Sequence, residues 1–120
     1  MVKHVILWQL KDGLSDSEKA EIKTGIKTGL EALQGKISGL VQIRVETNPL
    51  ESSNADVMLD STFENEEALQ GYAVHPAHVA VADGKVRPYV KTRVCMDYVG
   101  YSSQANVIKL SGQPDLMAGV

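Results

Sequence analysis

LVQIRVETNPLESSNADVMLDSTF, residues 40–63, decides the fold, because it reads as two short strands joined by a polar loop. Apolar and polar side chains alternate in both halves, which is typical of strands with one buried face. The apolar residues are Val41, Ile43 and Val45 in the first half and Val57, Leu59 and Phe63 in the second. The loop between them is rich in Asn, Pro and Ser, which favour turns. The stretch therefore predicts an antiparallel pair of strands.

The chain before this pair predicts a strand followed by a helix. Residues 2–10 carry apolar side chains on both faces, as in a strand covered on both sides. After a break at residues 11–13, Ser15 and Glu18 have the spacing of a capping box, so a helix is expected to begin there. Its apolar stripe is Ile22, Ile26, Leu30, Leu33 and Ile37, and Gly35 and Gly39 close it.

The chain after the pair predicts a broken helix and a last strand. Asn65 is a suitable N-cap, with acidic residues in the first turn behind it. The helix is expected to stop before Pro76, because a proline disfavours helical geometry in the residue that precedes it. Pro76 can itself open a new helical piece, to about residue 81. Alternation from 90 to 101 predicts the final strand.

The order strand, helix, strand, strand, helix, strand predicts an α+β domain, a ferredoxin-like β-α-β-β-α-β sandwich over residues 1–101. Helices on one face leave the other face of the sheet open, yet several strands carry apolar side chains there. We therefore expect a homodimer in which two sheets close into an α/β barrel. The C-terminal tail, residues 102–120, is either a frayed end or an arm packed on the dimer partner.

Composition excludes several classes of function. The chain has 120 residues and a net charge of -3, with no basic stripe, so we expect no nucleic acid partner. The apolar run near the N-terminus is far too short to cross a membrane, so we expect no membrane association and a cytoplasmic location. The single cysteine, Cys95, cannot form an internal disulfide, and a thiol in a strand is usually an inert small hydrophobe.

Reactive side chains are concentrated in the run Tyr72-Ala-Val-His75-Pro-Ala-His78. His75 is expected to cap the broken helix, and His78 to point from the kink into a cavity. Tyr72 and His78 can meet only if the kink turns the second helical piece, because six residues of unbroken helix span about 600°. If they meet, phenol and imidazole form an acid–base pair. His4 lies on the first predicted strand. A structural role, as a half-buried residue that is hydrogen-bonded to a neighbour, is as well supported there as a role in chemistry.

Metal and cofactor chemistry is not indicated. His75 and His78 supply two ligands at a spacing that chance easily produces, and Asp83, Asp60 or His4 would have to complete a zinc site. No glycine-rich loop follows a strand in the manner of a phosphate site. We therefore expect no metal and no cofactor.

The run Gly71–Val79, the opening residues 2–7 and the strand end Thr62-Phe63-Glu64 resemble the stress-responsive dimeric α/β-barrel family. The resemblance implies a ferredoxin-like homodimer. A plant member of that family is a cofactor-free polyketide cyclase, and the matching residues here are Tyr72 and His78. The cyclase has a further histidine where this chain has Val57, so its substrate does not carry over.

The resemblance implies that His78 is the general base, that Tyr72 orients it, and that His4 lines the pocket. We expect Trp8 and His75 to contact the ligand as well. The leading hypothesis is a protein that binds a small, apolar, carbonyl-bearing molecule and, if it is an enzyme, acts as a cyclase, isomerase or lyase. The alternatives are a non-catalytic stress or binding protein and a cofactor-independent oxygenase. A cavity of about 300 Å³ or more that His78 reaches favours the first hypothesis, and a barrel filled by Trp8, Met58 and Met96 opposes it.

Overall fold

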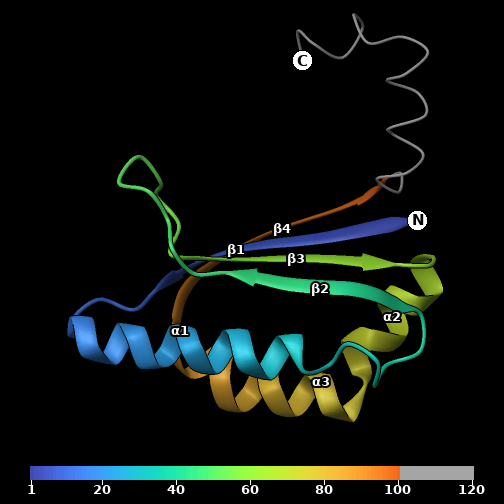
Figure 1. Ribbon diagram of the computed structural model, residues 1–120, viewed down its shortest axis with the longest axis horizontal. Coiled ribbons are helices and arrows are strands. Elements are labelled where there is room, and N and C mark those ends of the chain that lie inside the picture. Colours follow the sequence, from blue (N-terminus) through green and yellow to red (C-terminus); the bar gives the residue numbers. More distant parts are fainter. Residues whose placement is uncertain (101–120) are drawn as a thin grey trace, which may run out of the picture.

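Four strands pair into one antiparallel sheet in the order β2-β3-β1-β4, and the helices lie against one face of it (Figure 1). The computed structural model describes residues 1–100. The elements are β1 (Val2–Leu10), α1 (Asp16–Glu31), β2 (Leu40–Glu46), β3 (Val57–Phe63), α2 (Glu66–Val74), α3 (Pro76–Val81), a π-helical turn η1 (Ala82–Val86), a 3₁₀ turn η2 (Arg87–Tyr89) and β4 (Val90–Val99). The predicted α+β, ferredoxin-like plan is confirmed. The predicted tail, residues 102–120, lies outside the described residues.

Helix α1 begins at the predicted capping box. The Ser15 hydroxyl accepts from the Glu18 N–H, and the Glu18 carboxylate accepts from the Ser15 N–H, both at 3.1 Å. The helix ends at Glu31, earlier than the stripe to Ile37 suggested, so that prediction was too long. Leu33 and Ile37 nevertheless reach the core from turns that follow the helix. A non-helical turn can place an apolar side chain against the core just as a further helical turn would. The spacing of the apolar residues therefore does not show where the helix ends.

Strand β2 departs from the predicted alternation at its start. Val41 was expected on the buried face but is 40% exposed, whereas Leu40 is buried. The pairing register with β3 shifts between Leu40 and Gln42, which places one extra residue in β2. Such a bulge turns the extra side chain away from the face that its neighbours share. Ile43 and Val45 keep the predicted buried face.

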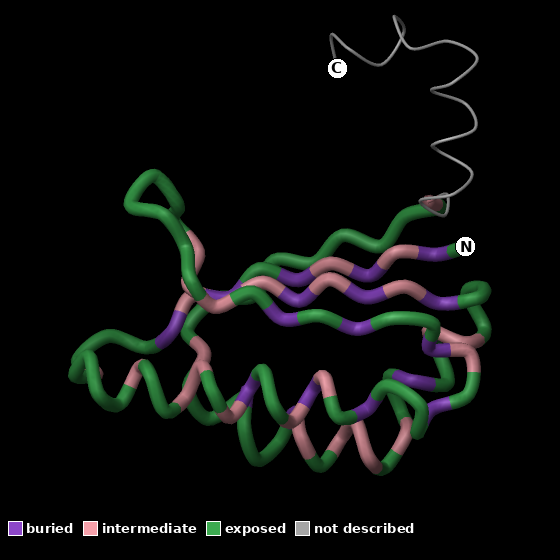
Figure 2. The backbone as a smooth tube through the Cα atoms, in the orientation of Figure 1, coloured by how far each residue is buried: buried purple, intermediate pink, exposed green. Residues whose placement is uncertain are grey.

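The core fills the space between the helices and one face of the sheet. Buried positions alternate with less buried ones along β1 and β3, so each strand turns one face inward (Figure 2). The largest fully buried side chains include Phe63, Tyr72, Ile26 and Leu30. The first strand is therefore covered by helices on one face only.

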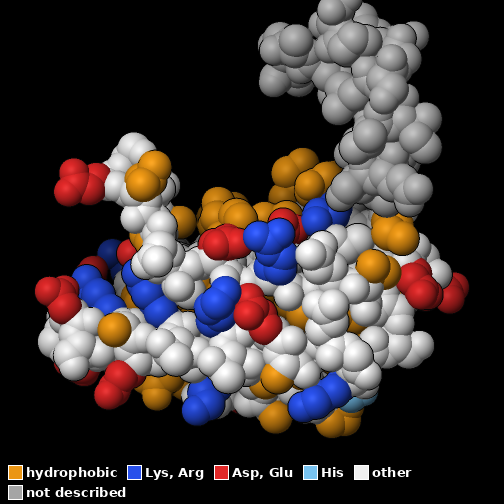
Figure 3. Space-filling model, in the orientation of Figure 1, with side chains coloured by type: hydrophobic (Ala, Val, Ile, Leu, Met, Phe, Trp, Pro, Cys, Tyr) orange, Lys and Arg blue, Asp and Glu red, His pale blue; other side chains and the backbone are white. Residues whose placement is uncertain are grey.

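The opposite face of the sheet is open, and it divides into an apolar and a charged part. Figure 3 shows hydrophobic side chains gathered along the upper border of the molecule, above the sheet. The exposed apolar residues of β1 and β4 there are Leu7, Val94, Met96 and Tyr98. Lys3 and Asp60 form an ion pair at 2.6 Å beside them. Across residues 1–100, no helix has the length and hydropathy that a membrane crossing requires.

Candidate functional site

The break between α2 and α3 brings Tyr72 and His78 together. His75 has extended backbone angles (φ -65°, ψ 132°), so the chain changes direction before Pro76 opens α3. The His75 ring nitrogen Nδ1 accepts from the Ala77 N–H at 3.1 Å, as the predicted cap. The rings of Tyr72 and His78 then face each other, with centroids 4.1 Å apart and planes inclined by 33°. The sequence-predicted pair therefore meets because of the kink.

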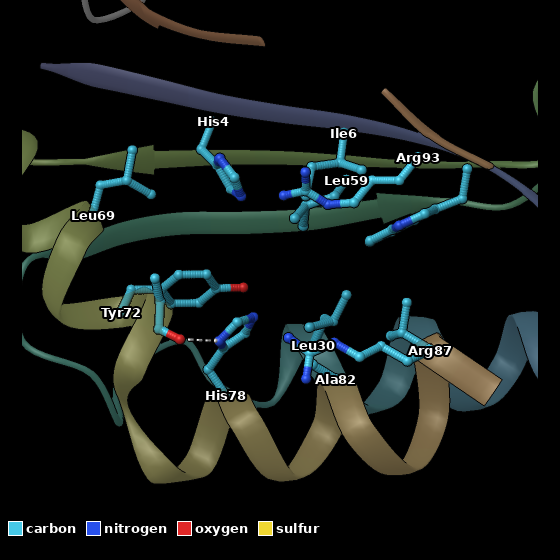
Figure 4. Close-up of a pocket in the computed structure, with 13 residues that line it drawn as sticks. His4, Ile6, Leu30, Leu59, Leu69, Tyr72, His78, Ala82, Arg87 and Arg93 are labelled. Carbon is cyan, nitrogen blue, oxygen red and sulfur yellow. Dashed lines mark hydrogen bonds between the residues drawn. The ribbon is translucent and has the colours of Figure 1, made fainter. Parts of the chain in front are cut away.

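These two rings form one wall of a cavity of about 140 Å³ between the helices and the sheet. His4, Ile6 and Arg93 enter from the sheet side, and Tyr72 and His78 lie on the helical side (Figure 4). The other lining residues are Trp8, Leu30, Leu59, Leu69, Ala73, Ala82, Val86 and Arg87. His75 does not line this cavity. The walls are mostly apolar, with imidazoles, a phenol and guanidinium groups between them.

The cavity is less than half the volume of about 300 Å³ that typifies small-molecule sites. A 150 Å³ apolar cavity nevertheless holds a benzene molecule, so there is room for a ligand of about six heavy atoms. An open groove of about 730 Å³ adjoins the cavity and shares His4, Leu69, Ala73 and Arg93 with it. A longer ligand would have to extend into this groove. Met58 and Met96 do not fill the cavity, because they lie on the open face of the sheet.

Tyr72 presents a hydroxyl without a partner. Its side chain is buried, and no residue among 1–100 forms a hydrogen bond with its Oη atom. A buried hydroxyl without a partner costs about 1–3 kcal/mol. Burial also raises the pKa of the phenol well above its usual range, so it keeps its proton at any physiological pH. Tyr72 is therefore a hydrogen-bond donor that lacks an acceptor.

His78 presents a basic nitrogen. Its Nδ1 atom lies 3.2 Å from the Ala73 carbonyl oxygen, which can only accept, so Nδ1 carries the proton and Nε2 is free to act as a base. Burial lowers the pKa of His78, and the nearby side chains of Arg87, His4 and Arg93 lower it further, against the opposing effect of the Ala73 carbonyl. His78 is accordingly neutral at pH 7.

His4 is held by an acidic residue that the sequence did not single out. Its Nδ1 atom lies 2.5 Å from Asp97 Oδ1 on β4, and its ring packs edge to face against Phe63 and Tyr72. Burial raises the pKa of Asp97, but the hydrogen bond and charge of His4 outweigh burial and leave it below its usual value. Asp97 could have been found only from the register of β1 and β4, in which it faces His4.

The sequence did not point to two arginines of the site, and it placed Cys95 without showing its exposure. Arg87 lines the cavity and forms an ion pair with Asp83, and Arg93 lines both the cavity and the groove. Cys95 was expected to be an inert strand residue, and it lies at an exposed position of the edge strand β4. Partial desolvation and the neighbouring Asp97 raise the pKa of Cys95, which makes it a weak nucleophile at pH 7 and agrees with that expectation.

Comparison with known proteins places this arrangement in a wider group. A family model described as the stress-responsive A/B barrel domain matches residues 2–100. Two Arabidopsis thaliana proteins described as containing a stress-response A/B barrel domain are similar. One is 28% identical over 93% of this chain, which spans only 41% of that relative's length. The other is 32% identical over 68% of this chain and 73% of its own length.

Solved structures share the fold. A dimeric protein of unknown function with a ferredoxin-like fold, from Bacteroides fragilis, is 33% identical over 82% of this chain and 95% of its own, with a TM-score of 0.77. A hydroxynitrile lyase from Passiflora edulis is 16% identical over 85% of this chain and 94% of its own, with a TM-score of 0.63. The second likeness is one of fold alone.

Proposed function

We propose, because the chain belongs to the stress-responsive A/B barrel domain family, that it binds a small carbonyl compound in the cavity that Tyr72 and His78 line, and that it moves a proton on this compound. The observation that carries this proposal is the buried Tyr72 hydroxyl, which has no acceptor among the described residues. A ligand carbonyl oxygen would supply the missing acceptor. The mostly apolar walls and the volume of about 140 Å³ suit a compact aliphatic or cyclic ketone.

The proposed step is removal of a proton next to the carbonyl. The Nε2 atom of His78 takes the proton from the α-carbon, and the electron pair of the C–H bond becomes the double bond of an enolate. Negative charge gathers on the carbonyl oxygen, where the Tyr72 O–H donates a hydrogen bond. The Ala73 carbonyl, 3.2 Å from Nδ1, stabilises the imidazolium that forms. Return of the proton to the same carbon gives hydrogen exchange, and return to another carbon completes an isomerisation. If the enolate carbon instead attacks a second carbonyl of the ligand, a carbon–carbon bond forms, the π pair of that carbonyl becomes an alkoxide, and the alkoxide takes the proton back from His78, which completes a cyclisation.

Two other functions fit the family, and one of them has a specific observation in its favour. A non-catalytic binding or stress protein is supported by the small volume of the cavity, which leaves little space for two reacting groups. A cofactor-independent oxygenase gains little support, because the monooxygenase-like structure from Nitrosomonas europaea is only 10% identical and shares the fold alone.

The open face of the sheet supports a homodimer as the working unit. Its exposed apolar residues on β1 and β4 include Leu7, Val94 and Met96. Contiguous apolar surface of this kind usually marks an interface. The similar structures from Bacteroides fragilis, Thermobifida fusca and Jannaschia are all described as dimeric. Because the cavity lies on the other face of the sheet, each subunit would keep its own site.

The function is tested by hydrogen exchange on cyclopentanone, a ketone of six heavy atoms. In deuterium oxide the wild-type protein is expected to speed the loss of the α-hydrogen signal in proton NMR spectra, relative to buffer alone. Binding without exchange would support the non-catalytic alternative. If cyclopentanone neither shifts the melting temperature nor exchanges faster, the proposal fails.

The pH dependence of this exchange follows from the two ionisable groups. A base works only when unprotonated, and the pKa of His78 is below its ordinary value of 6.5. The exchange rate is therefore expected to rise with pH, to be half-maximal below pH 6.5 and to level off above that midpoint. Because burial raises the pKa of Tyr72, no fall is expected below pH 10. A midpoint above pH 7 would contradict His78 as the base.

A further inference from the structure

A second group of reactive side chains lies beside the cavity, where β1 pairs with the edge strand β4. His4 pairs with Asp97 across the two strands, and the neighbouring inward position of β1, Ile6, pairs with Cys95. Because alternate residues of a strand share a face, Cys95 and Asp97 lie on the same side of the sheet as His4. The three side chains line the floor of the open groove. The sequence did not suggest this set, because its members are far apart along the chain.

We propose that His4, Cys95 and Asp97 bind a divalent metal ion of the zinc class. Imidazole nitrogen, thiolate sulfur and carboxylate oxygen are the three protein ligands that Zn²⁺ prefers. The His4, Cys95 and Asp97 donor atoms all lie within 4.8 Å of one another. This site shares His4 with the cavity, but it does not depend on the proposed carbonyl chemistry.

The distances between the donor atoms fit one ion. Cys95 Sγ lies 3.8 Å from His4 Nδ1 and 3.5 Å from Asp97 Oδ1. Metal bonds of about 2.0–2.3 Å in a tetrahedron place ligand atoms about 3.3–3.6 Å apart, so the Cys95–Asp97 edge matches and the Cys95–His4 edge would have to close by about 0.2 Å. The third edge, between His4 Nδ1 and Asp97 Oδ1, is a hydrogen bond of 2.5 Å. It would have to open by about 0.8 Å as the ion replaces the shared proton.

The surroundings allow an ion to enter and to be held. The His4 ring is buried and fixed by Phe63 and Tyr72, so one ligand is already in place. Cys95 and Asp97 are exposed on the edge strand, and the groove above them has space for waters to complete the coordination. Arg93 opposes the binding of a cation, because it lies on the same face of β4, two residues before Cys95. The two charges of thiolate and carboxylate balance the ion, and the arginine lowers its affinity.

Cobalt binding tests this site, because the chain has a single cysteine and any thiolate-to-cobalt absorption band must arise from Cys95. The protein is treated with a chelator, kept reduced, and titrated with Co²⁺. We expect one equivalent to bind with a thiolate charge-transfer band and with tetrahedral visible bands, and Zn²⁺ to displace it. Cys95→Ser should lose the charge-transfer band. Asp97→Asn should weaken binding by more than about tenfold, since even an outer-shell partner typically contributes that much.

Asp60→Asn is the matched control, because Asp60 is a carboxylate on the open face of the same sheet. It should bind Co²⁺ like the wild type. Alkylation of Cys95 in the folded wild-type protein checks the same point without a mutation and should abolish the band. The proposal is overturned if the wild type shows no saturable binding, or if Cys95→Ser and Asp97→Asn bind Co²⁺ as tightly as it does. The spectra report the metal directly, so failure of the cyclopentanone assay leaves this result unaffected.

Discussion

Replacing His78 with glutamine is expected to lower the rate of α-hydrogen exchange on cyclopentanone by about 10²–10⁴-fold, the usual contribution of a positioned base. Glutamine is similar in length and uncharged, but its amide cannot accept a proton at neutral pH. The variant should therefore have a lower rate of α-hydrogen exchange. Proton NMR at constant ketone concentration measures it.

His75→Asn is the matched control for His78→Gln. His75 lies at the same helix break but caps α3 through the Ala77 N–H and does not line the cavity. Asparagine is a good N-cap, so the kink should persist and the exchange rate should stay within about threefold of the wild type. If His78→Gln keeps the wild-type rate, or if His75→Asn loses as much, His78 is not the base.

The second large effect is expected for Tyr72→Phe. Loss of a donor that faces developing negative charge typically lowers a rate by about 10²–10³-fold, so the exchange rate should fall by that amount. The stability of the folded protein, in contrast, should not fall. The variant removes a buried hydroxyl that has no partner among residues 1–100, so the free energy of unfolding should be unchanged or higher by about 1 kcal/mol. Urea unfolding measures stability, and the NMR assay measures the rate.

Tyr89→Phe provides the comparison for Tyr72→Phe. Tyr89 is partly exposed in η2 and lines neither the cavity nor the groove, so its hydroxyl should matter little to exchange. A Tyr72→Phe protein that is less stable by more than about 1 kcal/mol would mean that the hydroxyl has a partner in solution. Exchange at the wild-type rate would mean that it does not touch the ligand.

Most of the fold could be predicted because the signals for it act between residues that are neighbours in the sequence. The capping box at Ser15 and the proline after His75 act on their immediate neighbours, so both helix starts and the kink could be placed correctly. One error came from apolar turns that continue the stripe of α1 beyond Glu31, and the other came where strand pairing overrides the local pattern. Val41 turns outward because β2 carries an extra residue against β3, and no periodicity reveals such a bulge.

The site was only half predictable for the same reason. Tyr72 and His78 are close along the chain, and a kink between them was enough to suggest that they meet. Asp97 and Arg93 reach the site through the pairing of β1 with β4, which joins opposite ends of the chain. The volume of the cavity depends on how side chains from both layers fill it. None of these can be read from spacing alone.

The most direct test of the account is a crystal structure of the protein with bound cyclopentanone. We predict the ketone in the cavity of about 140 Å³, with its oxygen within hydrogen-bonding distance of Tyr72 Oη and an α-carbon facing Nε2 of His78. A ketone bound only elsewhere, with the Tyr72 hydroxyl still without a partner, would contradict the central claim.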